Sequence, residues 1–210
     1  MIINRKIETA LRIVLGVCFI LSGAMKAVNV YSFAQEIRLY SEAYMDSFFL
    51  PWRVEIAVVI CAIETITGLL ALKQKCASVV SIVFLCMLSF FVWLTGLNLF
   101  SPSLMGSIES CGCFGELVHF SPLEAFLKSV VLWVMAAWLW GLCLRKGWNM
   151  RFKDVLMYYK TYVIAIAGLA PAVYSYLFFE KWEHGWYIAG YIGLCVVLLV
   201  LLRYCYGSSK

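Results

Sequence analysis

Two cysteines separated by one glycine are the residues of this sequence best suited to chemistry. Cys111, Gly112 and Cys113 lie in a polar stretch between two long apolar segments. A disulfide between cysteines so close together is strained, and strained, exposed disulfides are readily reduced. Gly112 has no side chain to crowd such a ring, and Gly115 loosens the backbone after it. The pair is therefore suited to exchange with a partner protein through a mixed disulfide.

Other interpretations of this cysteine pair stay open. Each sulfur could form a structural disulfide, although no other cysteine is expected on the same side of the membrane. The pair could be inert. A metal site is not expected, because two sulfurs and His119 make a weak ligand set without the usual spacing of zinc-binding cysteines.

A second polar group lies in the first two apolar segments, where Ser22 and Lys26 are followed by Glu55 and Glu64. At 1.5 Å per residue, Lys26 matches Glu55 in depth better than Glu64, which we expect near the level of Cys18. A carboxylate as deep as Glu64 should face the bundle and be paired or protonated, and it is a functional candidate. Lys26 could instead extend to the headgroups. The alternatives are thus a ligand pocket or a structural polar pair.

Three further cysteines lie inside apolar segments. Cys18, Cys61 and Cys86 could form a relay, but cysteine in such surroundings acts as a small packing residue, and packing is the interpretation we favour. Gly23 and Gly68 are expected to let helices approach closely.

The composition requires that lipid, rather than water, surrounds most of the chain. Hydrophobic residues make up 64% of its 210 positions and charged residues 14%, and the mean hydropathy is +0.89. A soluble domain has roughly 45–50% apolar and about 25% charged residues. The net charge of +5 does not indicate nucleic-acid binding, because the basic residues form short clusters between apolar segments.

Helices that cross a bilayer need about 20 mostly apolar residues. Six segments meet or approach this length: 7–30, 53–72, 76–99, 123–144, 159–179 and 186–205. Most of the 17 Lys and Arg residues lie at the two termini and in alternate connections. Because such loops stay in the cytoplasm, we expect both termini inside a bacterial inner membrane, with the first segment as an uncleaved anchor. Segments 31–51 and 101–122 should then lie outside.

The outer segment 31–51 mixes aromatic and charged residues. It could be an amphipathic helix that lies along the membrane surface or an ordinary loop that ends at Pro51 and Trp52. The sequence leaves both alternatives open.

These motifs together resemble the MauE/DoxX family of membrane proteins. The resemblance rests on Ser22-Gly23-x-x-Lys26, on Glu64-x-x-x-Gly68 and above all on the string Cys111-Gly112-Cys113-Phe114-Gly115. It covers about residues 7–145. It implies an all-α integral membrane bundle, with a four-helix core over residues 1–145 and a two-helix C-terminal extension over residues 146–210.

The resemblance also implies a role in extracytoplasmic thiol–disulfide chemistry with a thioredoxin-like partner. The four-helix core is similar in shape to the vitamin K epoxide reductase type of enzyme, which uses a quinone. A quinone is therefore a candidate cofactor, although that enzyme's Cys-x-x-Cys does not match the Cys-x-Cys of this chain.

We therefore interpret the sequence as a membrane thiol–disulfide oxidoreductase or redox-relay component. Cys111 and Cys113 would exchange electrons with the partner, and Ser22, Lys26 and Glu64 would shape a polar pocket below them. Two alternatives remain: a carrier or binding protein for a small lipophilic or ionic ligand, and a non-catalytic assembly scaffold.

Overall fold

The structure, a computed structural model, describes residues 2–44, 47–72, 77–100, 121–145 and 159–207. All regular structure in these ranges is helical. The α-helices are α1 (Ile2–Val28), α2 (Val30–Tyr44), α3 (Arg53–Leu72), α4 (Ala77–Phe100), α6 (Pro122–Arg145), α8 (Tyr159–Phe178) and α9 (His184–Gly207), and a 3₁₀ helix, η1, covers Ser47–Trp52. The predicted all-α membrane bundle is confirmed.

Five of the six predicted membrane spans are confirmed as helices long and apolar enough to cross a bilayer. They correspond to α1, α3, α4, α6 and α9. The remaining predicted segment is also helical, but the apolar stretch of α8, Tyr162–Phe178, is shorter than the other five. The chain is thus a multi-pass membrane protein.

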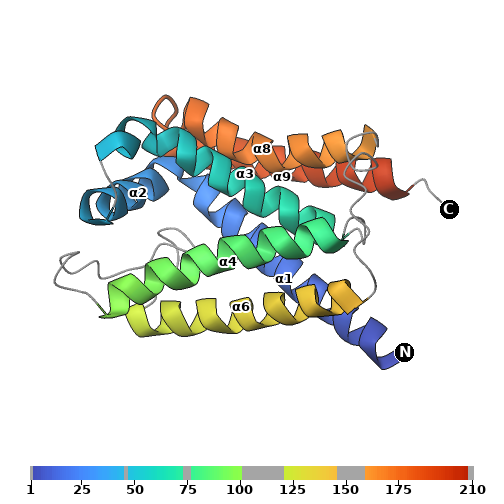
Figure 1. Cartoon of the computed structure of the whole chain (residues 1–210). Coiled ribbons are helices and arrows are strands. Elements are labelled where there is room, and N and C mark those ends of the chain that lie inside the picture. Colours follow the sequence, from blue (N-terminus) through green and yellow to red (C-terminus); the bar gives the residue numbers. More distant parts are fainter. Residues whose placement is uncertain (1, 45–46, 73–76, 101–120, 146–158, 208–210) are drawn as a thin grey trace.

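The long helices α4, α6, α8 and α9 run along the same general direction (Figure 1). α4 and α6 pack against each other on one side of the molecule, and α8 and α9 pack against each other on the other. α1 crosses obliquely between them and makes its most extensive contacts with α3. Both termini lie at one end of the bundle, and α2 lies at the opposite end, as the alternating charge pattern predicts.

The described part of segment 31–51 is helical, with α2 followed by η1, and is not an ordinary loop. α2 buries one face, with Phe33, Ala34 and Tyr40, while Gln35 and Arg38 are exposed. Phe33 and Ala34 pack into an apolar cluster with α1 and α3. The apolar face of α2 is therefore covered by the bundle itself.

Apolar side chains fill the bundle in two clusters. The cluster nearer the termini joins α1, α4 and α6 through Leu15, Phe84 and Leu139. The cluster near α2 joins α1, α2, α3 and α8, and it includes Val30 and Ala172. Polar side chains lie between the two clusters, as described below.

Glycines bring the backbones of α1 and α3 close together. A methyl group on Gly23 would lie 2.5 Å from Thr65 Oγ1 and 2.9 Å from the carbonyl oxygen of Cys61. A methyl group on Gly68 would lie 2.6 Å from the carbonyl oxygen of Gly16. These distances leave no room for a side chain, which confirms the packing role expected of Gly23 and Gly68.

This close approach predicts a large stability difference between two Gly→Ala substitutions. Gly23→Ala should lower the free energy of unfolding by about 1–3 kcal/mol, because the added methyl group forces the two helices apart. Gly193→Ala on α9, where nothing lies within 4 Å, is the matched control and should not destabilise the protein. Titration of the purified protein with a denaturing detergent measures both values, and equal stability of the two variants would contradict the packing described here.

Candidate functional site

Lys26 and Glu64 form an ion pair inside the bundle. The Lys26 ammonium donates a hydrogen bond to Glu64 Oε1 over 2.5 Å, and each side chain is only 1% exposed. Charged groups inside a membrane are costly unless they are paired. Glu64 therefore faces the bundle interior and is paired, as expected from its depth in the apolar segment.

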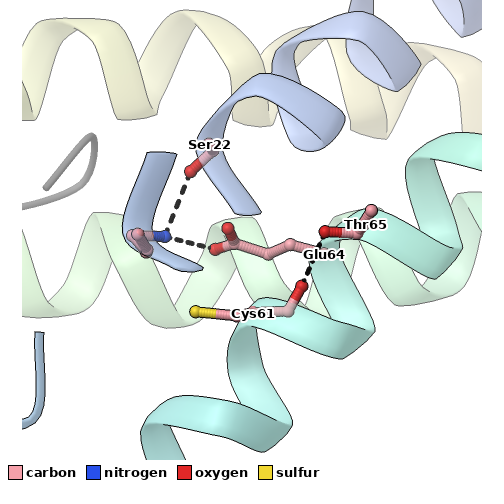
Figure 2. Close-up of polar contacts among 5 residues, drawn as sticks. Ser22, Cys61, Glu64 and Thr65 are labelled. Atoms are coloured by element: carbon pink, nitrogen blue, oxygen red, sulfur yellow. Dashed lines mark hydrogen bonds and ion pairs between the residues drawn. The ribbon is translucent and has the colours of Figure 1, made fainter. Parts of the chain in front are cut away.

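The remaining surroundings of the Lys26 ammonium are also protein groups. It donates a second hydrogen bond to Ser22 Oγ over 3.1 Å, and Figure 2 shows Ser22 and Glu64 reaching the same nitrogen from two helices. The nitrogen lies 5.1 Å from the ring centroid of Phe33 and 5.0 Å from that of Phe91, within the range of cation–π attraction. Lys26 therefore does not extend to the headgroups, and the structure brings Ser22, Lys26 and Glu64 together as a polar group.

Lys26 pairs with Glu64 and not with Glu55, so the depth match predicted from the sequence is wrong. Gly23 packs directly against Glu64 and Thr65, whose hydroxyl bonds the Cys61 carbonyl (Figure 2). This register sets Glu64 level with the last turns of α1. α2 and η1 lie between α1 and α3 in the sequence, and α3 begins well beyond the level at which α1 ends. Depths counted in residues from a common outer end of the two helices are therefore wrong.

Glu55 lies elsewhere, exposed in the first turn of α3. Burial raises the pKa of Tyr31 on α2 above the ordinary value for tyrosine, and the nearby carboxylates of Glu180 and Glu55 add to that shift. Glu55 thus belongs to the α2 end of the bundle and not to the polar group around Lys26.

A cavity of about 30 Å³ adjoins the ion pair, at the seam between α1, α3, α4 and α6. Lys128 and Ser129 of α6 line it, together with Cys18, Ser22, Lys26 and Glu64. Lys128 and Ser129 were not predicted as site residues. The sequence signal for Lys128 is that it is the one basic residue inside the apolar segment 123–144, a placement typical of a functional position.

The second carboxylate oxygen of Glu64, Oε2, is buried and has no hydrogen-bond partner among the described residues. A cavity of this volume holds one or two water molecules, and a water there could donate to Oε2. Benzene, by comparison, occupies an engineered cavity of about 150 Å³. The ring of a quinone therefore does not fit the cavity, and we assign no chemical step to a quinone.

The sequence-predicted Cys111, Gly112, Cys113, Phe114 and Gly115 lie outside the described residues. They belong to the connection between α4, which ends at Phe100, and α6, which begins at Pro122. Those two ends lie at the α2 end of the bundle (Figure 1).

Cys18, Cys61 and Cys86 occupy three different environments. Cys61 is buried in the apolar cluster near α2, Cys18 lines the cavity, and Cys86 is exposed on α4. These separate placements do not favour a relay among the three. Over the ranges that the structure covers, no group of three or more His, Cys, Asp or Glu side chains is placed to hold a metal ion.

Removing one member of the ion pair should be strongly destabilising. Lys26→Met leaves the Glu64 carboxylate buried without its cation, and we expect the free energy of unfolding to fall by about 3–5 kcal/mol. The double variant Lys26→Met/Glu64→Leu should recover part of this loss, since no charge then remains buried. Detergent-induced unfolding measures all three proteins.

An exposed ion pair on α2 supplies the control. Arg38 and Glu42 lie 3.4 Å apart with side chains 45% and 49% exposed, so Arg38→Ala should cost less than about 1 kcal/mol. Equal losses for Lys26→Met and Arg38→Ala would show that burial does not strengthen the dependence on the inner pair.

Comparison with known proteins agrees with the sequence motifs and the helical architecture. Protein TlpB of Flavobacterium psychrophilum is 26% identical over 172 residues, which are 77% of this chain and 44% of that protein. The chain thus spans less than half the length of this relative. No solved structure matches the chain significantly. The family model described as methylamine utilisation protein MauE matches residues 4–142, from the start of α1 almost to the end of α6. The chain therefore belongs to the MauE family.

Proposed function

We propose that this MauE-family protein is a membrane component of thiol–disulfide exchange, and that Cys111 and Cys113 are its reactive groups. The observation that carries the proposal is the Cys-Gly-Cys string between two spans of a family member. The ends of α4 and α6 that flank this string lie at the same end of the bundle as α2 (Figure 1). A redox-associated role in the membrane accounts for both the motif and the fold.

The distribution of basic residues supports an orientation in which this end of the bundle faces outside the cell. Arg5, Lys6 and Arg145 lie toward the opposite end, where both termini are found. Because Lys- and Arg-rich ends stay in the cytoplasm, the cysteines would face the space outside a bacterial inner membrane. Thiols there are oxidised unless a partner reduces them, which is why the partner we propose is an extracytoplasmic thioredoxin-like protein.

The exchange requires no cofactor at the cysteine pair. A thiolate of the reduced pair attacks a sulfur of the partner's disulfide, and one partner thiolate leaves. The second cysteine then attacks the mixed disulfide, which closes Cys111–Cys113 and releases the partner as a dithiol. Two electrons pass to the partner, whose leaving thiolates take up two protons. The same steps in reverse oxidise the partner.

A second function is favoured by the cavity beside Lys26 and Glu64. Two lysines and one glutamate are among the residues that line a small cavity inside a membrane bundle, as expected of a binding protein or carrier for a small ionic ligand. Under this alternative, Glu64→Gln should abolish function, and a variant without Cys111 and Cys113 should remain active.

Serine substitution tests the thiol–disulfide proposal directly. Of the single variants Cys111→Ser and Cys113→Ser, at least one should accumulate a mixed disulfide, because the sulfur that would resolve it is missing. The double variant should form none and should lose exchange activity. Non-reducing electrophoresis of intact cells, with a membrane-impermeant thiol reagent, reports both the species and its side of the membrane.

Cys86→Ser is the control for these variants, since Cys86 is an exposed thiol on α4 within the membrane. It should leave labelling and exchange unchanged. Full activity of the Cys111→Ser/Cys113→Ser protein, or labelling only from the cytoplasmic side, would end the proposal.

A further inference from the structure

The backbone between α1 and α2 is interrupted inside the bundle. α1 ends at Val28, only two residues after Lys26, and α2 begins at Val30. Ala27 and Val30 are fully buried there. A helix break leaves backbone donors and acceptors without their helical partners, and buried groups of this kind must find partners within the protein.

Asn29 accepts the hydrogen bond of one backbone N–H, and this leaves one backbone carbonyl without its helical donor. Its side-chain oxygen accepts a hydrogen bond from the Ser32 backbone N–H over 3.1 Å, as an N-cap of α2 does. In an unbroken helix the Ser32 N–H would bond the carbonyl oxygen of Val28. That carbonyl therefore needs a donor from elsewhere in the molecule.

Side chains of α8 and α9 supply the missing partners. The Tyr187 hydroxyl donates to the Val28 carbonyl oxygen over 2.5 Å. The Ser175 hydroxyl donates to the same oxygen over 3.4 Å and accepts the Val30 N–H over 3.2 Å. Ser175 is fully buried and Tyr187 nearly so.

A fourth contact reaches the turn of α1 that carries the lysine. The Tyr191 hydroxyl donates to the Ala24 carbonyl oxygen over 2.9 Å. Ala24 lies two residues before Lys26, so α9 is bonded to α1 on both sides of the lysine position. α8 is fixed in turn against α3, where Gly168 packs on Ile66.

We infer that α8 and α9, which lie beyond the residues matched by the MauE family model, hold the end of α1 so that Lys26 meets Glu64. Ser175, Tyr187 and Tyr191 are positioning residues, since they act on Lys26 through the backbone of α1 and do not touch its side chain. The two-helix extension thereby completes the polar site of the four-helix core. Only the link from this geometry to activity rests on the proposed thiol–disulfide function.

The double variant Tyr187→Phe/Tyr191→Phe removes two hydroxyls and keeps both rings. We expect backbone amide hydrogen exchange over residues 24–33 to accelerate by about tenfold or more, because two buried hydrogen bonds are lost there. The matched control is Tyr162→Phe/Tyr204→Phe, which removes one exposed hydroxyl from α8 and one from α9. It should leave exchange over residues 24–33 unchanged.

The infrared band of Glu64 separates positioning from general destabilisation. It is obtained as the difference between each protein and its Glu64→Gln counterpart. In the parent protein and in the control it should be that of a carboxylate paired with Lys26. In the Tyr187→Phe/Tyr191→Phe protein it should move to that of a carboxylic acid, because a buried carboxylate that loses its cation takes up a proton.

An unchanged Glu64 band together with unchanged hydrogen exchange over residues 24–33 would overturn the inference, as would equal changes in the control. If the double variant does not fold, Tyr191→Phe alone carries the same test, since Val28 then keeps both of its donors. Exchange of the Cys111–Cys113 pair with oxidised glutathione, measured on the same proteins, should slow in the Tyr187→Phe/Tyr191→Phe variant. If the Cys111→Ser/Cys113→Ser protein retains full activity, the thiol–disulfide function fails while the exchange and infrared results still decide the positioning role.

Discussion

A single ion pair in a medium that disfavours charge sets the conditions for the rest of this bundle. Lys26 and Glu64 tolerate burial only while they stay within hydrogen-bonding distance, because separating them leaves two charges in a poorly polarisable interior. Gly23 brings the two helices into the required register. Phe33 of α2 and Phe91 of α4 cover the ammonium group. Four helices are thus committed to the surroundings of one nitrogen atom.

Much of the architecture could be predicted from the sequence, because the existence and bounds of membrane spans depend on local apolar length. The polar candidates Ser22, Lys26 and Glu64 were also identified, since charge inside an apolar segment is conspicuous. Their pairing was not, because it depends on how far α1 and α3 are offset along the bundle, and the prediction matched Lys26 with Glu55. Lys128 was not among the predicted site residues, since a mostly apolar helix gives little signal for which of its faces is buried.

The residues that match the MauE family and the residues that hold the polar site in place do not cover the same part of the chain. The match to MauE ends within α6, yet the hydroxyls that complete the backbone of α1 come from α8 and α9. In the sequence, Tyr187 and Tyr191 are indistinguishable from the aromatic residues that anchor helices at a membrane surface. Their function depends on where the hydroxyl groups end, and only the folded arrangement contains that information.

The cavity lies where α4 and α6 pack against α1 and α3. The packing between these two helix pairs differs along their length. Toward the termini, α1 packs against α4 and α6 through the apolar cluster around Leu15 and Phe84; toward α2, the polar cavity lies in the same seam. The α4–α6 hairpin would therefore pivot about its tightly packed end more easily than it would slide. Such a rotation would enlarge the space beside Glu64 without separating Glu64 from Lys26.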